Sequence, residues 1–335
     1  MKSLPNSKIT VRYGIATAFL LFSALPGLLL GSTELSIPQA LLSIISGDLG
    51  SPEARILLYV RMPRVLATLV CGAALAVSGA VIQGVLANRL ASPGIIGVNA
   101  GAGLAVTLCS AFGVIGGWRL SLFAFLGAFL TVMLVSLGAR RRNASRGTVI
   151  LIGVALNALL GAISDTVVTF CPEVSIMSSD FKIGDFSAVT YQKILPAAAV
   201  VLLSLLVLQT LWSELDVLTL GDGSARGLGM NVGVARTVFL LLAALLAGAA
   251  VSVCGLLSFV GLLVPHALRR LSISQNKHLI PLCALCGAGF VTLCDTLARV
   301  AFAPYELPVG ILMAFLGAPF FIFLLLRGKG GQHHA

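Results

Sequence analysis

Residues 64–84 read "RVLATLVCGAALAVSGAVIQG", and after Arg64 this run contains neither a charged side chain nor a proline. A helix that crosses a bilayer needs about 20 consecutive, mostly apolar residues, because the hydrocarbon core is about 30 Å thick. Residues 65–84 meet that length on their own. The stretch therefore predicts a transmembrane helix, and the fold of the whole chain depends on how often the pattern recurs.

Apolar runs of this kind recur along the whole chain. Of its 335 residues, 58 % are hydrophobic and only 10 % are charged, whereas a soluble domain has about 25 % charged residues. Polar, Pro-rich and Gly-rich breaks separate the runs. We predict an all-α polytopic membrane protein, a single domain over 1–335 with about ten helices in one compact bundle. The expected spans are 14–31, 64–84, 94–113, 119–138, 147–170, 192–212, 234–254, 256–270, 279–299 and 306–326.

The distribution of Lys and Arg predicts the orientation of these spans. Ten spans place both termini on one side, and that side holds 15 of the 22 Lys and Arg residues, including those of "ARRRNASR" at 139–146. Cytoplasmic loops of membrane proteins collect such residues, so both termini are expected in the cytoplasm. The same rule explains the net charge of +10 better than nucleic-acid binding does, because no folded basic face is evident. The N-terminal run is long for a signal peptide and lacks a clear cleavage site, which favours an uncleaved first span.

Segments outside the spans complete the predicted architecture. Residues 36–48 place Pro38 where a helix would begin and suit a short helix at the outer surface of the membrane. Residues 171–191 are polar enough for an outer connection with a partial helix. The remaining segments are expected to be a cytoplasmic N-terminus at 1–13, an outer segment at 32–63, a cytoplasmic loop at 213–233 and a cytoplasmic tail at 327–335.

The stretch "GDGSARGLG" at 221–229 raises the question of a phosphate-binding loop, because glycines beside polar residues can cradle phosphate. It lacks the Lys followed directly by Ser or Thr with which such a loop ends. "RGKGG" near the C-terminus lacks the hydroxyl that would bind magnesium. We expect a short helix instead, capped by Asp222 or Ser224 and ended by Gly227 or Gly229.

Motifs for covalent catalysis and metal binding are absent from the sequence. There is no H-E-x-x-H and no marked nucleophile turn. Cys283 and Cys286 lie in an apolar run with no second pair at zinc spacing, so we expect them to be buried and inert. We therefore predict no catalytic residue, no metal site and no cofactor bound by this chain.

Polar groups inside the spans are informative, because an ionisable group in a membrane is costly and often functional. Asp165, in the outer half of its span, is a candidate for a substrate path; alternatively it lies near the head groups and pairs locally. Asp295 and Arg299 are one helical turn apart and can pair. Asn157 and Gln83 favour hydrogen bonds between helices over ligand contacts.

Glycines inside the spans predict close helix packing. Small residues let membrane helices approach each other, and packing rather than hydrophobicity drives their association. Gly97 with Gly101, and Gly153 with Gly161, are the expected contact positions.

Four blocks of the sequence resemble a known family. They are "VRMPRVLATLVCGAALAVSGAVIQGVLANRLASPGIIGVNAGAG" (60–103), "GDGSARGLGMNVGVAR" (221–236), "GLLSFVGLLVPHALRRL" (255–271) and "LCDTLARVAFAPYELPVGILMAFLGAPFFIFLLLR" (293–327). In order and spacing over about 56–327 the chain resembles the FecCD permeases, the membrane subunits of type II ABC importers for ferric siderophores, haem and vitamin B12. One turn departs from the family, with Asn88-Arg89-Leu90-Ala91 where Asn-Pro-Leu-Ala is usual.

The resemblance implies partners and a reaction class. A dimer of permeases, of one chain or two similar chains, would enclose the pathway in a bacterial cytoplasmic membrane. ABC ATPase subunits holding ATP and Mg would lie below it, and an extracytoplasmic substrate-binding protein above. The chain itself would not be an enzyme. Its expected cargo is an iron chelate, a siderophore or haem, moved by alternating access, with cobalamin as the alternative.

The resemblance also assigns expected roles to residues. Arg61, Arg64 and Arg299 match outer arginines that dock the binding protein, and Asn157 and Asp165 are the pathway candidates. The loop that couples to the ATPase corresponds to Gly221, Asp222, Ser224, Ala225, Arg226, Gly227, Leu228 and Gly229.

Two other function classes remain open from the sequence. A secondary transporter would need no ATPase, but buried ion-coupling acids and inverted repeats are not evident. An intramembrane enzyme would need a nucleophile or metal cluster facing a cavity, and none is visible.

Overall fold

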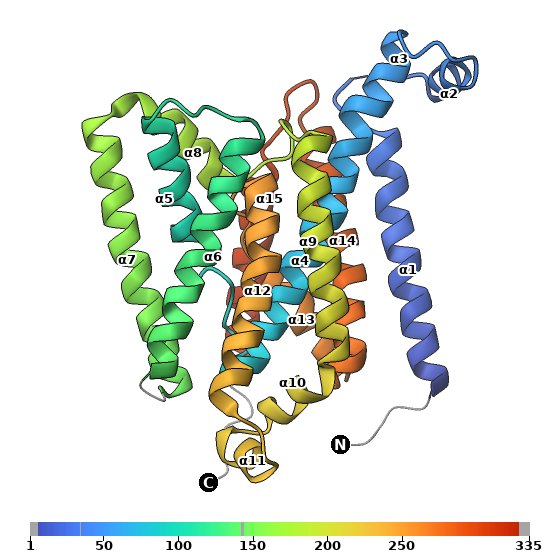
Figure 1. The fold of residues 1–335 in the computed structure, drawn as a ribbon. Helices are drawn as coiled ribbons and strands as arrows, with labels where there is room; N and C mark the ends of the chain where they lie inside the picture. Colours follow the sequence, from blue (N-terminus) through green and yellow to red (C-terminus); the bar gives the residue numbers. More distant parts are fainter. Residues whose placement is uncertain (1–5, 34, 142–143, 328–335) are drawn as a thin grey trace.

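Helices make up the regular structure of the residues described in this computed structural model, which are 6–33, 35–141 and 144–327 (Figure 1). Ten helices in this part of the chain correspond to the ten predicted spans. They are α1 (Asn6–Leu29), α4 (Met62–Leu86), α5 (Val98–Ala111), α6 (Gly117–Arg141), α7 (Arg146–Phe170), α9 (Tyr191–Thr210), α12 (Val232–Cys254), α13 (Val260–Arg270), α14 (Asn276–Val300) and α15 (Val309–Arg327). The all-α prediction is confirmed.

Not every predicted span is a full crossing. Seven helical segments are long and apolar enough to cross a membrane, and α5 and the first part of α15 are shorter apolar helices. The predicted break at Cys254–Gly255 is confirmed, because α12 ends there and Gly255 has a φ of +72°. Beyond it α13 has only 11 residues, a rise of about 16 Å. The expected span 256–270 is therefore a half-length helix that follows a non-helical turn.

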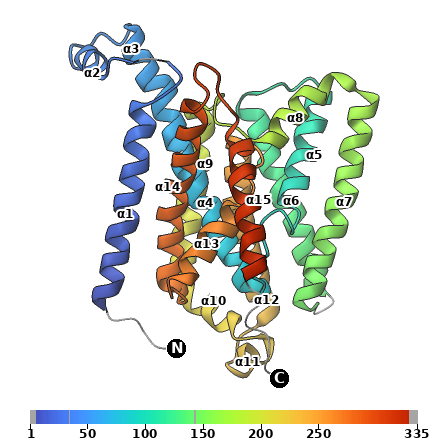
Figure 2. The same ribbon diagram turned by 180° about the vertical axis from the view of Figure 1, so that it is seen from behind.

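Short helices lie at both ends of the bundle (Figure 1). One end carries α2 (Ile37–Ile45), α3 (Pro52–Arg55) and α8 (Ser175–Ile183), so the short helices predicted in 36–48 and 171–191 are confirmed. A π-helix (Ile56–Arg61) joins α3 to α4, and a 3-10 turn (Pro172–Val174) precedes α8. The opposite end carries α10 (Trp212–Thr219) and α11 (Asp222–Gly227). Helix α1 begins and α15 ends at that second end (Figure 2).

Helix α4 lies at the centre of the bundle, against α12, α13 and α14. Gly72 of α4 faces Gly287 of α14, and Gly79 of α4 faces Gly261 of α13; a Cβ on Gly72 or Gly79 would overlap the facing carbonyl oxygen. The backbones therefore touch directly, as close packing between membrane helices requires.

The glycine contacts predicted from the sequence are mostly confirmed. A Cβ on Gly97 or Gly101 would overlap Thr131 of α6, and one on Gly153 would overlap the carbonyl oxygen of Ile95. The prediction for Gly161 is wrong, because nothing lies within 4 Å of its ideal Cβ position. Gly161 of α7 therefore makes no close contact with a neighbouring helix.

Candidate functional sites at the two ends of the bundle

Residues 212–231 form a compact knob of two short helices, α10 and α11, at the end of the bundle that is predicted to face the cytoplasm (Figure 1). We call it the cytoplasmic knob. Gly221 joins them with a φ of +112°, a value that side-chain-bearing residues rarely adopt. Three side chains of the knob itself are fully buried, those of Leu215, Leu218 and Ala225. Three apolar side chains therefore fix the two short helices against the end of the bundle.

A shared carboxylate anchors the knob to two long helices. Asp222 Oδ1 accepts a hydrogen bond from Arg146 Nε at 3.0 Å, and Oδ2 accepts one from Arg236 Nη2 at 2.6 Å. Arg146 also donates to the carbonyl of Leu218 at 2.8 Å, and Arg236 donates to that of Ala144 at 2.7 Å. The knob is thus tied to the start of α7 and the start of α12 by charge-assisted bonds, which are stronger than neutral ones.

The electrostatics of this anchor favour the ionised carboxylate. Burial alone would raise the pKa of Asp222, but the hydrogen bond and charge of Arg236, together with the charge of Arg146, hold the pKa below its ordinary value. The expectation that Asp222 or Ser224 caps α11 is wrong, because no side chain caps that helix. The expected end at Gly227 is confirmed.

A second carboxylate holds α10 against α14. Asp216 Oδ1 accepts hydrogen bonds from the backbone N of Asn276 at 3.0 Å and from its side-chain Nδ2 at 2.7 Å. Burial raises the pKa of Asp216, and the two bonds from Asn276 oppose that shift. Neither this contact nor the pairing of Arg146 and Arg236 with Asp222 was predicted from the sequence. The signal available in the sequence was an acidic residue, Asp222, in a loop expected on the same side of the membrane as Arg146 and Arg236.

The outward side chains of the knob are exposed. Ser224, Arg226, Leu228 and the glycines between them are exposed, and Leu228 is 67 % exposed. An ideal Cβ on Gly223 or Gly227 would meet nothing within 4 Å. The knob therefore combines a fixed base with an open apolar and basic surface, as a docking element requires.

The opposite end of the bundle holds a buried outer charge cluster, made up of Arg61, Arg64, Asp185, Asp295, Arg299 and Glu306. Asp295 is fully buried on α14 and accepts hydrogen bonds from Arg64 of α4 at 3.0–3.1 Å. Arg299 Nε lies 3.1 Å from Asp295 Oδ2, an oxygen that Arg64 Nε also bonds, so the pairing predicted one turn apart is confirmed. Arg64 also bonds Glu306 at 2.7 Å, and Glu306 accepts from Ser32 at 2.6 Å.

Two arginines of the outer charge cluster cap the C-terminal end of α1 by hydrogen bonding to backbone carbonyls. Arg61 donates to the carbonyls of Leu28 at 3.0 Å and Thr33 at 2.8 Å, and Arg299 donates to that of Gly27 at 3.0 Å. The last carbonyls of a helix have no partner within it and carry partial negative charge, so cationic donors suit them. This capping role was not foreseen from the sequence.

The three predicted docking arginines therefore lie together at the outer end, but they are buried. Their exposed fractions are 3 % for Arg61, 5 % for Arg64 and 2 % for Arg299. Three carboxylates balance their charge, those of Asp295 and Glu306 and, 3.9 Å from Arg64, that of Asp185. The docking role stays a prediction. The accessible members of the cluster are Glu306 and Asp185, whose side chains are 30 % and 29 % exposed.

The polar residues predicted inside the spans have defined partners. Asn157 Nδ2 donates to the carbonyls of Gly94 at 2.8 Å and Ile95 at 3.3 Å. Gln83 Nε2 donates to Gly261 O at 3.0 Å. Both contacts join separate segments, as the hydrogen-bonding hypothesis predicts.

Asp165 lies apart from these contacts, near the outer end of α7. Its side chain is 75 % exposed and its Oδ1 lies 3.7 Å from Lys182 Nζ of α8. The local pairing named as the alternative is therefore present. The pathway roles of Asn157 and Asp165 stay predictions.

Metal ligands do not gather anywhere in the described residues: no group of three or more His, Cys, Asp or Glu side chains could hold an ion. All seven cysteines are free. Cys283 is buried as predicted, whereas Cys286 is only half-buried; that both are inert stays a prediction.

Comparison with known proteins gives one consistent family. The FecCD transport family matches residues 17–327. The chain is similar to the uncharacterized ABC transporter permease protein YvrB of Bacillus subtilis, with 34 % identity covering 96 % of this chain and 95 % of that one. It is also similar to the vitamin B12 import system permease protein BtuC of Escherichia coli O127:H6, with 37 % identity covering 90 % and 93 % of the two chains.

Solved structures agree with the family. A protein assigned to the metal-chelate type of ABC transporter, in an inward-facing conformation, has a TM-score of 0.84 and 31 % identity, covering 95 % of this chain and 99 % of that one. The structure of PsaBC from Streptococcus pneumoniae in complex with Fab has a TM-score of 0.56 at 17 % identity, covering 84 % of this chain and 94 % of that one. The second likeness concerns the fold alone.

Proposed function

The chain belongs to the FecCD transport family and is a multi-pass membrane permease of the ABC importer type, and we propose that it carries an iron chelate, a siderophore or haem, across a bacterial cytoplasmic membrane by alternating access. The cytoplasmic knob is the observation that supports an ATP-driven mechanism. It is anchored by Asp222 and exposes the side chains of Ser224, Arg226 and Leu228. A secondary transporter would have no use for such a surface.

ATP would be hydrolysed by separate ABC ATPase subunits that hold ATP and Mg, and the residues 221–229 would transmit their movement. Asp222 and Ala225 are turned inward and fix the knob, whereas Ser224, Arg226, Gly227 and Leu228 are exposed and would contact the ATPase. Gly221 and Gly229 have φ values of +112° and +82°, and would shape the turns.

The substitution Gly227→Glu tests this assignment. The new side chain has room within the permease, so thermal stability and membrane insertion should be unchanged. In the reconstituted complex, substrate uptake per ATP should fall more than about tenfold, because a misplaced charge in an interface costs more than about 1.4 kcal/mol. Gly227→Ala is the matched control and should transport normally. Normal uptake by Gly227→Glu would refute the assignment.

A substrate-binding protein would dock at the outer end, and a second permease, the same chain or a similar one, would complete the pathway. We propose that Arg61, Arg64 and Arg299 form the docking cluster, with Glu306 holding Arg64 until a carboxylate of the partner replaces it. Asn157 and Asp165, on α7, are the proposed pathway residues.

The variant Glu306→Gln tests the docking proposal. Removing the charge of Glu306 releases Arg64 Nη1 for the partner while Asp295 still holds the rest of the guanidinium. Affinity for the cognate binding protein should therefore rise about fivefold, the equivalent of about 1 kcal/mol, the net contribution of one typical hydrogen bond. Asp165→Asn removes a carboxylate from α7 and should leave that affinity unchanged. Equal affinities for wild type and Glu306→Gln would count against Arg64 as a docking residue.

Cobalamin is the second candidate cargo, because the BtuC permeases named for vitamin B12 import share up to 37 % identity with this chain. Both cargoes are large chelates. Direct binding of the cognate binding protein to a panel of ferric siderophores, haem and cobalamin, followed by uptake of the preferred compound through the complete transporter, distinguishes them. Preference for cobalamin would overturn the iron-chelate assignment and leave the permease assignment in place.

A further inference from the structure

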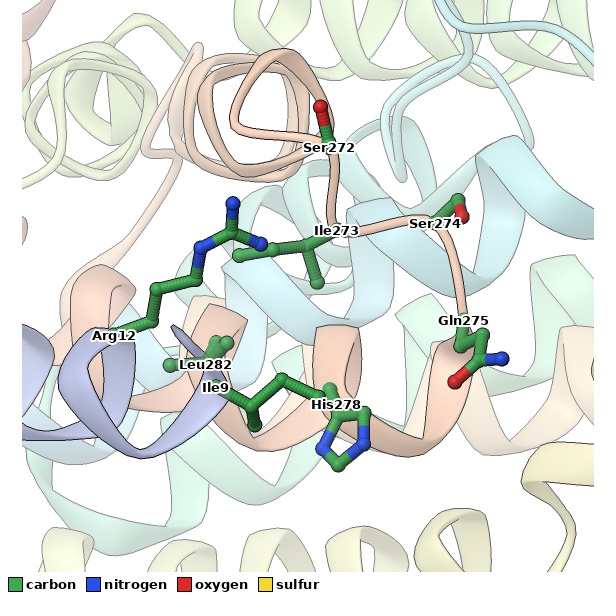
Figure 3. Close-up of a pocket in the computed structure, with 8 residues that line it drawn as sticks. All are labelled: Ile9, Arg12, Ser272, Ile273, Ser274, Gln275, His278 and Leu282. Carbon is green, nitrogen blue, oxygen red and sulfur yellow. The ribbon is translucent and has the colours of Figure 1, made fainter. Parts of the chain in front are cut away.

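A polar pocket at the cytoplasmic end of the bundle lies between α1 and the turn that joins α13 to α14 (Figure 3). Arg12 comes from α1, Ser272 and Ser274 from the turn, and His278 from the start of α14. Figure 3 shows the Arg12 side chain extending toward the segment with Ser272 and Ile273. The pocket thus gathers one cation, two hydroxyl groups and an imidazole.

Arg12 lacks a complete set of partners within the described residues. Its Nη1 is buried and has no hydrogen-bond partner there, and no ion pair of Arg12 occurs in that part of the chain. The remaining residues near the ends of the chain, 1–7 and 324–335, include no Asp or Glu. A buried guanidinium nitrogen without an acceptor is costly, so an anion from outside the chain is the natural partner.

The neighbouring side chains are compatible with that anion. Lys8 lies one turn before Arg12 on α1, and Arg270 and Lys277 flank the turn; all three are exposed. Tyr13 Oη lies 3.3 Å from His278 Nδ1 and ties α1 to α14 beside the pocket. The pocket has a volume of about 20 Å³, enough for one or two oxygen atoms. An anion would therefore insert an oxygen and remain largely outside.

A separate apolar cavity lies next to the pocket along α13 and α14, on the side toward the middle of the bundle. It has a volume of about 520 Å³ and is lined by Phe19 of α1, Leu271 of the turn, Cys286 and Phe290 of α14, and Leu316 and Phe320 of α15. Leu271 directly precedes Ser272 of the polar pocket, and Cys286 is one turn beyond Leu282, which also lines that pocket. The two sites are therefore consecutive along the same helices.

The distance along α14 fits a fatty-acyl chain. Four residues of α14 are spaced four apart, so each lies on the same face as the one before it and one turn further along the helix: His278, Leu282, Cys286 and Phe290. From His278 to Phe290 the helix rises about 18 Å, which is more than half of the roughly 30 Å hydrocarbon core. An anionic group at the cytoplasmic end with an apolar tail pointing inward is the form of a phospholipid of the inner leaflet.

We propose that the groove between α1 and α13–α14 is a binding site for an anionic phospholipid, whose phosphate bonds Arg12 and Ser272 and whose acyl chain fills the cavity beside Phe19 and Phe290. This site is independent of the cargo and of the docking surfaces. It gives α1, which otherwise packs mainly on α14, a lipid that joins its cytoplasmic half to α13 and α15.

Native mass spectrometry of the purified permease tests the proposal. Phosphatidylglycerol and phosphatidylcholine with identical acyl chains are added separately, and the retained lipid is measured for wild type and Arg12→Gln. Wild type should prefer phosphatidylglycerol, and Arg12→Gln should lower its affinity for that lipid about fivefold, the loss expected for one cation at an anionic lipid surface. Arg140→Gln, which removes an exposed cation from another cytoplasmic helix end, is the matched control and should behave as wild type.

Ala267→Phe tests the cavity separately, since Ala267 lines it and is exposed. Phenylalanine should occupy the acyl site and reduce retention of both lipids. Glycerol phosphate, which has the head-group chemistry without a tail, should fail to displace the bound lipid. Equal retention by Arg12→Gln and wild type would overturn the proposal, as would displacement by glycerol phosphate. A change of oligomeric state in Ala267→Phe without loss of lipid would assign the cavity to a second protein chain instead.

Discussion

The two ends of the bundle use charge in opposite ways. At the outer end, Arg64, Asp295 and Arg299 are almost fully buried and pair with one another. At the cytoplasmic end, the anchor on Asp222 is half-buried and supports a surface of exposed residues. The charges of the outer cluster are therefore largely neutralised by their own ion pairs, whereas the outward side chains of the cytoplasmic knob are open to solvent. Substitutions at the two ends should separate stability from function.

Removing the central carboxylate of the outer charge cluster should have the largest effect on stability. Asp295→Asn leaves Arg299 and part of Arg64 buried without a counter-charge, and breaking a buried pair costs about 3–5 kcal/mol. Thermal unfolding of the purified protein in detergent should show a large fall in melting temperature. Asp165→Asn is the control, because that side chain is 75 % exposed and its ion pair should contribute little. Similar melting temperatures for Asp295→Asn and wild type would mean that the cluster does not hold the outer end together.

The anchor of the knob should give an intermediate effect. Asp222→Asn keeps the shape of the side chain but removes the charge that pairs with Arg146 and Arg236. The expected loss is about 1–2 kcal/mol, less than for Asp295, because Asp222 is 30 % exposed and solvent screens the pair. Limited proteolysis within 213–233 should become faster, while the melting temperature of the whole protein changes little.

Ser224→Ala is the control for that experiment, since Ser224 is exposed on the same short helix. It should be cleaved at the wild-type rate. Unchanged cleavage of Asp222→Asn would show that Leu215, Leu218 and Ala225 hold the knob without the ion pairs.

Mild acid should have the smallest effect. The pKa of Asp222 lies below its ordinary value of 3.8, so its contribution to stability is present above that value and is lost as the pH falls through the lowered pKa. After correction for the intrinsic pH dependence of amide exchange, the hydrogen-exchange protection of α11 (Asp222–Gly227) should therefore be the same at pH 8 and at pH 5, and should fall only below 3.8. Loosening of the knob between pH 8 and pH 5 would contradict the ion-pair anchor.

Local patterns in the sequence were sufficient for much of the fold. The spans follow from run length, because each backbone polar group in a bilayer must be satisfied within its own helix. The pair Asp295–Arg299 follows from a spacing of four residues on one helix. The break at Gly255 and the short helices near 36–48 and 171–191 were also foreseen from residues that are close in sequence.

Contacts between distant residues could not be foreseen in the same way. Arg146 reaches Asp222 across 76 residues, and Arg61 reaches the end of α1 at Leu28 across 33. The prediction of a helix contact at Gly161 failed because a small residue allows close packing only where a neighbouring helix lies on its face, and none lies within 4 Å there. The groove with Arg12 and Phe290 depends on how α1 lies against α13, α14 and α15.

The sequence by itself determined that this is a helical membrane protein, where most of its helices begin and end, and which family it resembles. These properties depend on solvation and hydrogen bonding within short segments. Only the tertiary structure decided which charges are buried and which remain available. That choice depends on the register at which helices cross, as at Gly72 and Gly287, and a crossing of this kind brings together residues that no local pattern connects.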